Sequence, residues 1–146
     1  MRTLFHLLIF SIPFSLSAQT SSDSTKIVQL LIKDYKTLAH WDIESHLNNC
    51  TDDYYLIENG QLWTSEDEQA YFQANHHRLI RRRDKFDIRY SSISGNSAYL
   101  IYELTTSFSE NGKYEVRHWI EDAHFKKING EWKISMIHSS EWRGEE

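Results

Sequence analysis

Histidines that alternate with apolar residues are the first side chains in this 146-residue chain that could do chemistry. His118, His124 and His138 lie in stretches with the two-residue period of strands. His138 shares parity with Trp132 and Met136, so we expect it to face the interior. An imidazole in an aromatic cavity acts as a general acid or base near neutral pH. The alternative is a core histidine that makes one hydrogen bond.

Acidic residues also lie among aromatic residues: Asp53, Glu103, Glu121 and Asp122. Two carboxylates in one pocket of low dielectric push their pKa values apart, which separates an acid from a base. The alternative is a cross-strand ion pair with a cation such as Arg117 or Lys126. Both interpretations stay open from the sequence.

The spacing of histidine and cysteine does not indicate a metal site. His118 and His124 are six residues apart, or about 20 Å along a strand. His76 and His77 are neighbours on an expected helix, so they diverge. The single cysteine, Cys50, excludes an intrachain disulfide and a thiolate cage for zinc, and we expect it to be a buried apolar residue. We expect no metal and no cofactor.

Large aromatic residues are numerous enough to line a pocket, at 14% of the chain. A ligand site combines apolar walls with a few polar groups. A plain hydrophobic core is equally compatible with this set. The candidate pocket residues are Trp41, Trp63, Tyr71, Phe72, Tyr102, Trp119 and Trp132.

Length and charge limit the class of protein. A chain of this length forms one domain that buries a core without staples. The net charge is -5, which is unsuited to general nucleic-acid binding through phosphates. We therefore expect no nucleic-acid partner.

The first residues predict export. Arg2 precedes an apolar run from Leu4 to Leu16, and Ser17-Ala18 then leads into a polar stretch. This is the pattern of a secretory signal peptide, and the run is too short to span a bilayer comfortably. We expect a signal peptide at 1–18, a flexible lead at 19–25 and one domain at 26–142. The mature chain would be periplasmic or extracellular, with no membrane partner.

The periodicity predicts helices first and strands afterwards. A short strand at 54–57 interrupts the helices, and Asn-Gly pairs mark two of the later hairpins. The basic residues from Arg78 to Lys85 would close the third helix, as a solvated end. This order indicates an α+β domain with an antiparallel sheet and segregated helices. The expected helices are 26–39, 43–49 and 65–82, and the later strands are 86–91, 98–108, 114–128 and 131–139.

Several local motifs resemble the nuclear transport factor 2-like superfamily, especially its SnoaL-like and ketosteroid-isomerase-like branch. They are the opening helix with Tyr35, the Trp41-Asp42 break, the stretch 47–54, the turn 58–60 and the closing strand 130–140. The resemblance implies a cone-shaped α+β barrel, in which a strongly curved antiparallel sheet wraps around the N-terminal helices. It also implies a homodimer formed through the sheet.

The resemblance implies roles for particular residues as well. Glu58 falls in register with the general-base carboxylate of the ketosteroid-isomerase-like members, although a carboxylate beside Asn-Gly is ordinarily solvated. Tyr35 corresponds to the tyrosine that donates to the developing oxyanion, and Tyr102 is a second candidate for that donor.

Three functions follow from these expectations. The first is an exported protein that binds a small apolar or aromatic molecule in the cone. The second is an isomerase, dehydratase or cyclase that uses Glu58 or His138 as its base. The third is a dimeric assembly module without catalysis.

Overall fold

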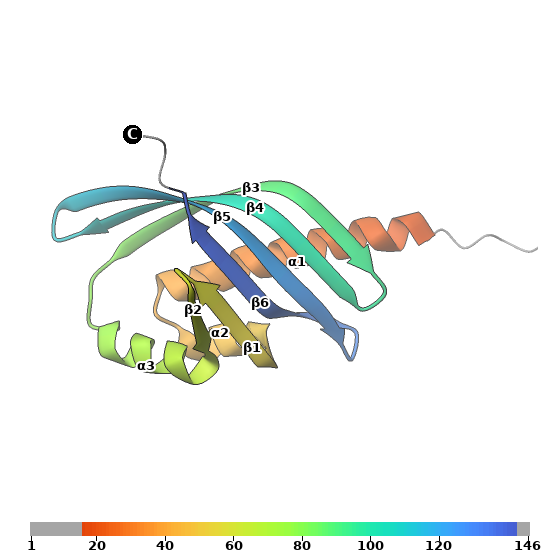
Figure 1. Ribbon diagram of the computed structural model, residues 1–146, viewed down its shortest axis with the longest axis horizontal. Coiled ribbons are helices and arrows are strands. Elements are labelled where there is room, and N and C mark those ends of the chain that lie inside the picture. Colours follow the sequence, from red (N-terminus) through yellow and green to blue (C-terminus); the bar gives the residue numbers. More distant parts are fainter. Residues whose placement is uncertain (1–15, 143–146) are drawn as a thin grey trace, which may run out of the picture.

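The computed structural model describes the backbone of residues 16–142 and the side chains of residues 23–142. Three helices lie against one six-stranded sheet (Figure 1). Among the described residues, no helix is long and apolar enough to cross a membrane. The elements are α1 (Leu16–Ala39), α2 (Ile43–Asn49), β1 (Cys50–Glu58), β2 (Gln61–Thr64), α3 (Ser65–Asn75), β3 (Arg81–Ser94), β4 (Ser97–Glu110), β5 (Lys113–Ile128) and β6 (Glu131–Glu141).

Helix α1 is longer than its periodicity predicts, because it begins at Leu16 rather than at Lys26. Residues 19–25 therefore lie within the helix, and no glycine or proline interrupts them. The expected signal peptide at 1–18 falls mostly outside the described residues. Asp23 is buried and bound by Lys127 at 2.8 Å, which fastens this part of α1 to the sheet.

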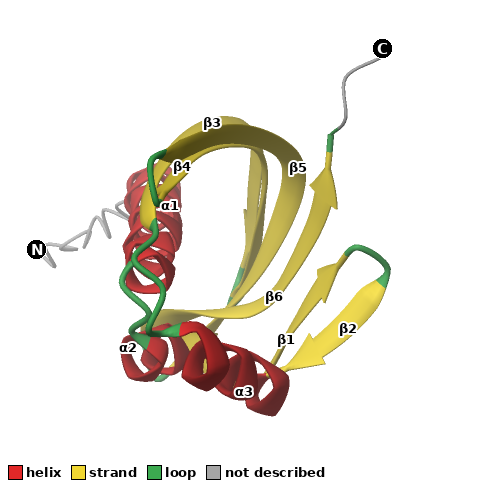
Figure 2. Ribbon diagram, turned by 90° about the vertical axis from the view of Figure 1, so that its left-hand side faces the viewer, coloured by secondary structure: helices red, strands yellow, loops and turns green. Residues whose placement is uncertain are grey.

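The expected break at Trp41-Asp42 is confirmed. Trp41 takes a left-handed backbone conformation with φ of 58°. Asp42 then caps α2, because its carboxylate accepts a hydrogen bond from the amide of Ser45 at 3.1 Å. The chain turns here, so that α2 and α3 lie across one end of the sheet (Figure 2).

The sheet is curved and open, in the strand order β2-β1-β6-β5-β4-β3 (Figure 2). The expected α+β cone is confirmed in its shape, but the sheet is mixed rather than wholly antiparallel. Strand β1 runs parallel to β6, with Tyr55 opposite Met136, and every other pair is antiparallel. The parallel pair arises because β1 returns from α2 to the free side of the last strand.

The hairpin turns follow the sequence closely. Asn111 and Gly112 have φ of 52° and 80°, and Asn129 and Gly130 have 52° and 86°. Positive φ at both central residues is what an Asn-Gly hairpin turn requires. The Asn111-Gly112 turn aligns β4 and β5 without a shift, whereas the register of β5 and β6 shifts between Phe125 and His124.

The third helix is shorter than expected, and the prediction that it reaches Arg82 is wrong. Helix α3 ends at Asn75, and β3 begins at Arg81. Its cap is Thr64, which exchanges hydrogen bonds with Asp67. Pairing with the long strand β4, starting at Arg81 opposite Ser109, overrides the local helical pattern.

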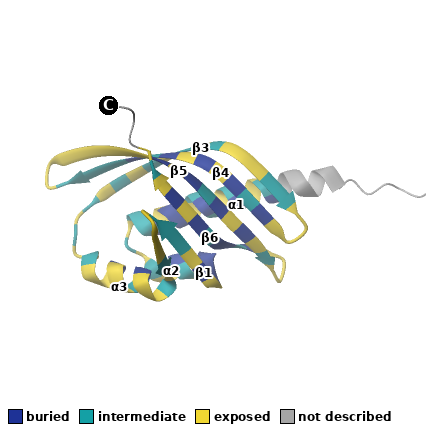
Figure 3. Cartoon of the chain, viewed as in Figure 1, coloured by how far each residue is buried: buried dark blue, intermediate teal, exposed yellow. Residues whose placement is uncertain are grey.

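The core lies between the concave face of the sheet and α1. Ile27, Leu31 and Tyr35, spaced four residues apart, form the buried face of α1. Trp119, Glu121, Ala123 and Phe125 alternate with exposed residues on β5, which gives the striped pattern in Figure 3. These buried faces also position the side chains of the site.

Candidate functional site

A cavity of about 390 Å³ opens between α1, α3 and the concave face of the sheet. Aromatic and aliphatic side chains form most of its wall. Charged and hydroxyl groups lie among them: Tyr35, Glu58, Glu68, Arg82, Arg117, Glu121 and Ser139. Apolar walls with a few polar groups are typical of small-molecule sites.

A hydrogen-bonded acid forms the polar part of this wall. Glu121 on β5 is 5% exposed. The Tyr35 hydroxyl donates to its Oε2 at 2.5 Å, and the Ser139 hydroxyl donates to its Oε1 at 2.7 Å. The hydroxyls of Tyr35 and Tyr102 lie 3.2 Å apart. Residues from α1, β4, β5 and β6 therefore meet at one carboxyl group.

Burial shifts the acidity of this group. The loss of water around Glu121 raises the pKa of its carboxyl, while hydrogen bonds from Ser139 and Tyr35 and the charge of Arg82 oppose that rise. Burial and the neighbouring Glu121 charge raise the pKa values of Tyr35 and Tyr102 well above their ordinary range. The cluster therefore retains its protons to a higher pH than the same groups in water.

Two cations and a second carboxylate lie around the same cavity. The Arg82 guanidinium lies 5.2 Å from the ring of Tyr35 and pairs with Asp84 at 2.8 Å. Arg117 pairs with Glu115 at 2.6 Å. Burial raises the pKa of Glu58, partly opposed by the charge of Arg82. Cavity and charges together suit a ligand with an apolar body and a polar or charged end.

Most of the expected aromatic residues do line this cavity. Trp41, Trp63, Tyr71, Phe72 and Trp119 are all in its wall. Their contacts are edge-on or tilted, with the Trp41 and Phe72 ring centroids 5.4 Å apart and those of Trp63 and Tyr71 5.9 Å apart. Such contacts are ordinary between aromatic side chains, so the cavity volume, and not the ring geometry, distinguishes this set from a filled core.

Two of the expected pocket residues lie elsewhere. Tyr102 is wholly buried behind the wall, where its hydroxyl lies 3.2 Å from that of Tyr35 and also interacts with Glu121. Trp132 lines a separate hollow of about 350 Å³ between α1, α2 and β6, and the Lys127 ammonium lies 5.2 Å from its ring. Tyr102 therefore supports the site from behind, whereas Trp132 lies outside it.

The expected catalytic residues divide in the same way. Tyr35 and Glu58 both line the cavity, although Glu58 precedes a turn where a solvated carboxylate is ordinary. His138 does not, because it is exposed on the convex face and lies 3.3 Å from Asp122. The expected inward orientation of His138 is therefore wrong. The register of β5 and β6 shifts between the pairs Phe125–Ile134 and His124–Met136, because β6 holds one extra residue there, Ser135. The side chains of β6 after Ser135 therefore point to the face opposite to the one that strict alternation predicts.

The other two histidines also face outward. His118 is exposed and bonded to Thr105 at 3.1 Å, and the ring of His124 stacks on Tyr99 at 5.8 Å. The convex face thus holds all three histidines that alternate along the late strands. Among the residues that the structure describes, no imidazole lies in the wall of the cavity.

The sequence points to Glu121 as an acid among aromatic residues, and of the two interpretations left open, the ion pair with Arg117 or Lys126 does not form at this residue. Its parity with Trp119 and Phe125 places it inside, as observed. Arg117 and Lys126, its expected partners, pair with Glu115 and Asp53 instead. Tyr35 and Ser139 are the actual partners, and their sequence distance leaves no local signal of the contact.

Arg82 and Glu68 are site residues that sequence reasoning missed. Arg82 was expected at a solvated helix end but alternates inward on β3, with Asp84 and Phe86. The two-residue alternation of Arg82, Asp84 and Phe86 could have indicated a strand with Arg82 facing inward. The surrounding basic residues made the same stretch resemble a helix end. Glu68 is buried in the second turn of α3 and bonded to His46 at 3.1 Å, a contact that no spacing indicates.

Comparison with solved structures identifies the fold. No protein-family model and no curated protein matches the sequence. A nuclear transport factor 2-like superfamily protein from Salmonella enterica superposes with a TM-score of 0.72 at 18% identity, over 85% of this chain and 94% of that one. A ketosteroid isomerase-like protein from Erwinia carotovora gives 0.67 at 14% identity, over 82% and 95%.

A third structural neighbour is an association domain. The association domain of CaMKII from C. elegans superposes with a TM-score of 0.69 at 20% identity, over 85% of this chain and 99% of that one. The chain therefore has the nuclear transport factor 2-like fold, as the motifs predict. One fold of this kind hosts unrelated functions, so function has to be argued from the site.

Proposed function

We propose that the cavity binds a small organic molecule with an apolar or aromatic body and a carbonyl or similar oxygen at one end. The observation that carries this proposal is the buried Glu121, 2.5 Å from the hydroxyl of Tyr35, in the wall of an aromatic-lined cavity. The rings offer apolar contact along the body of such a ligand. The Tyr35–Glu121 pair offers hydrogen-bonding groups to the oxygen at its end.

Binding is tested with a probe that imitates the expected oxygen. 2-Naphthol has an aromatic body and a hydroxyl that competes for the Tyr35–Glu121 pair, and tryptophans in the wall report its arrival by fluorescence. We expect saturable quenching, with affinity about tenfold or more weaker in Glu121→Gln. Glu103→Gln is the matched control, because Glu103 lies outside the cavity in a pair with Arg89 at 2.8 Å. Quenching that does not saturate, or that Glu121→Gln leaves unchanged, overturns the proposal.

The same pair supports a second function, catalysis of proton transfer. A buried carboxyl with a raised pKa beside a tyrosine resembles the donors that stabilise a developing oxyanion. Glu58, whose pKa is also raised by burial, is then the base that removes a proton next to the carbonyl carbon. This chemistry is that of an isomerase, dehydratase or cyclase.

Exchange of protons into deuterium oxide tests that step without knowledge of the substrate. With 2-tetralone as the probe, NMR follows loss of the hydrogens next to the carbonyl. We expect exchange above the buffer rate, reduced about 10²- to 10⁴-fold in Glu58→Gln, while 2-naphthol still binds. A rate equal to that of buffer, or one unaffected by Glu58→Gln, removes the catalytic proposal and leaves the binding proposal intact.

We also propose a homodimer through the sheet. The convex face carries exposed apolar residues on three adjacent strands, among them Tyr90, Ile101, Val116 and Ile120. An exposed apolar patch of this kind marks a site of association. Light scattering should give twice the mass of one chain, and Ile120→Glu should give the mass of one. A single-chain mass for the unaltered protein contradicts this proposal.

Export is our remaining proposal, and it depends on residues 1–18 alone. The N-terminal sequence of the protein recovered from outside the cytoplasm should begin near Gln19. Recovery of the uncleaved chain from the cytoplasm contradicts it.

A further inference from the structure

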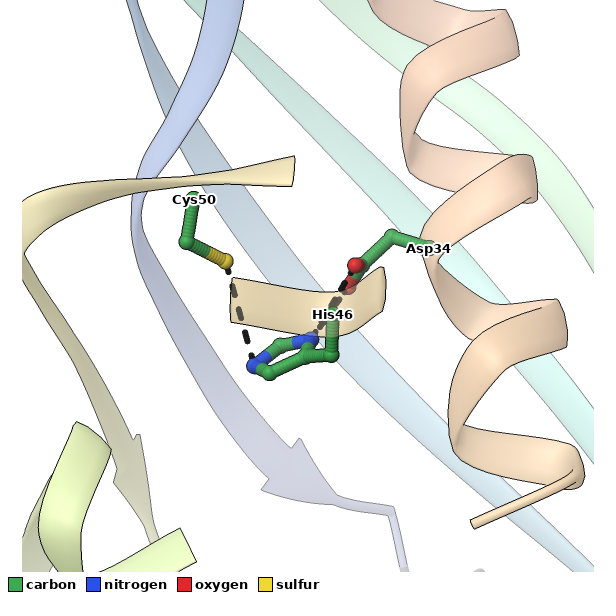
Figure 4. A group of neighbouring side chains, drawn as sticks. All are labelled: Asp34, His46 and Cys50. Atoms are coloured by element: carbon green, nitrogen blue, oxygen red, sulfur yellow. Dashed lines mark hydrogen bonds and ion pairs between the residues drawn. The ribbon is translucent and has the colours of Figure 1, made fainter. Parts of the chain in front are cut away.

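A second group of chemically competent side chains lies apart from the Tyr35–Glu121 pair, behind the wall of the cavity. Asp34 from α1, His46 from α2 and Cys50 from the start of β1 converge there (Figure 4). Glu68 from α3 joins them through the imidazole. Asp34 and His46 are wholly buried, and Cys50 and Glu68 are 6% and 7% exposed. Burial of so many polar groups raises the free energy of the folded protein unless the groups bind one another or an ion.

One side of the imidazole is fixed by Asp34. His46 Nδ1 lies 3.0 Å from both oxygens of that carboxylate. Asn49 donates to the same carboxylate at 3.0 Å, and Lys33 donates to Asn49 at 3.0 Å. A carboxylate on one ring nitrogen sets the tautomer and aims the other nitrogen, as in the carboxylate–histidine–metal arrangement of many zinc sites.

The other ring nitrogen faces two more donor atoms. His46 Nε2 lies 3.1 Å from Glu68 Oε2 and 3.8 Å from Cys50 Sγ. Tetrahedral zinc bonds of 2.0–2.3 Å hold neighbouring ligand atoms about 3.3–3.6 Å apart. The two observed separations bracket this range, so Glu68 Oε2 and Cys50 Sγ each lie at a distance from Nε2 that fits a second ligand of the same ion.

We propose that His46, Cys50 and Glu68 bind a divalent transition-metal ion of the zinc type, with Asp34 orienting the imidazole. One nitrogen, one sulfur and one oxygen donor suit Zn²⁺, whereas Ca²⁺ and Mg²⁺ take oxygen donors. The dication replaces two protons, that on Nε2 and that on the thiol, so the buried cluster keeps its net charge. Glu68 also lines the cavity, so a fourth ligand can reach the ion from there.

The site shares only Glu68 with the wall of the cavity, and it shares none of the residues that the proposed function places at the ligand oxygen or in proton transfer. The single cysteine excludes a thiolate cage, but a mixed donor set needs only one thiolate. The competing arrangement is an imidazolium clamped between Asp34 and Glu68, in which both ring nitrogens carry protons. The two arrangements differ in whether a metal bonds to sulfur.

Cobalt is the probe that distinguishes them. The full chain is stripped with a chelator, kept reduced and titrated with Co²⁺. We expect one equivalent to bind with a sulfur-to-cobalt charge-transfer band, which only Cys50 can supply because it is the only cysteine. Zn²⁺ should displace the cobalt and remove the band. A stoichiometry of one without that band, or no binding, overturns the proposal in favour of the clamped imidazolium.

Variants separate this site from surface histidines and from misfolding. Cys50→Ser should remove the band and His46→Gln should abolish tight binding, while Asp34→Asn should weaken it about 10- to 100-fold. His76→Gln/His77→Gln is the matched control, because these two exposed imidazoles adjoin on the surface away from any cysteine, and it should leave the band unchanged. Near-ultraviolet circular dichroism of each metal-free variant checks the fold. A folded Cys50→Ser protein that binds cobalt as tightly as the parent contradicts the assignment.

Discussion

Replacement of Tyr35 by phenylalanine removes one oxygen atom from the centre of the cavity wall. The ring stays, and with it the edge-on contact to Phe86 at 5.1 Å and the Arg82 guanidinium at 5.2 Å. What is lost is the 2.5 Å hydrogen bond to Glu121 and the 3.2 Å contact with Tyr102. The change therefore isolates the hydrogen bonds of the site from its packing.

The expected loss of stability follows from these two contacts. A hydrogen bond to a charged group contributes about 1.5–3 kcal/mol, so Tyr35→Phe should lower the free energy of unfolding by about 2 kcal/mol. Tyr102→Phe loses the 3.2 Å contact with Tyr35 and a weaker interaction with Glu121, and about 1 kcal/mol is expected. At about 4 °C per kcal/mol for a domain of this size, the Tm values fall by about 8 °C and about 4 °C.

Thermal and urea unfolding of both variants measures this difference. Tyr55→Phe is the control, because Tyr55 is 39% exposed, and it should change stability by less than about 0.5 kcal/mol. A double-mutant cycle of Tyr35→Phe with Glu121→Gln should give a coupling of about 1 kcal/mol or more. The reasoning is refuted if Tyr35→Phe costs no more than Tyr102→Phe, or if the cycle shows no coupling.

Two further predictions concern other contacts of the described residues. Because burial raises the pKa of Glu121 above 4.5, its stabilising effect is fully present below that pH and is lost as the pH rises through the folded-state pKa. The free energy of unfolding of the parent, relative to that of Glu121→Gln, should therefore fall with rising pH. Urea unfolding at several pH values measures this difference, and a difference that does not change with pH contradicts the prediction. Lys127→Met should cost about 2 kcal/mol, because the buried Asp23 loses its 2.8 Å partner and keeps Lys26 at 3.6 Å. Lys126→Met, whose 2.7 Å pair with Asp53 is exposed, should cost less than about 1 kcal/mol. Equal costs for the two lysines would show that burial of the pair does not matter.

The fold could be predicted where local chemistry and the final structure agree. Asn111-Gly112 and Asn129-Gly130 adopt the backbone that these pairs favour, and Asp42 caps α2 as its side chain allows. The inward orientation of Trp119 was also predictable, because the two-residue period of its strand sets it, whereas Trp41 lies in the break before α2 and Trp63 lies in a strand that the periodicity does not predict. These features depend on neighbours in the sequence.

The rest depends on contacts between distant residues. His138 faces outward because one extra residue at the β5–β6 register shift reverses the parity of the strand, and nothing near His138 signals that shift. Arg82 lies in the cavity wall because the stretch around it pairs with β4 as a strand, although its local sequence favours a helix. The bond from His46 to Asp34 joins two helices, each of which looks ordinary alone. Long-range pairing, rather than local preference, decides these positions.

The parallel pairing of β1 with β6 sets the order in which the molecule can be completed. Strands β3 to β6 form three consecutive hairpins, whose contacts are local and therefore close quickly. Strand β1 can pair only after β6 is available, because its partner lies about eighty residues later in the chain, as in the pair Tyr55 and Met136. During synthesis the segment from α2 to α3 consequently leaves the ribosome long before its place in the sheet exists. The aromatic cavity, which that segment closes, is thus among the last parts of the protein to form and among the first to open when the β1–β6 edge separates.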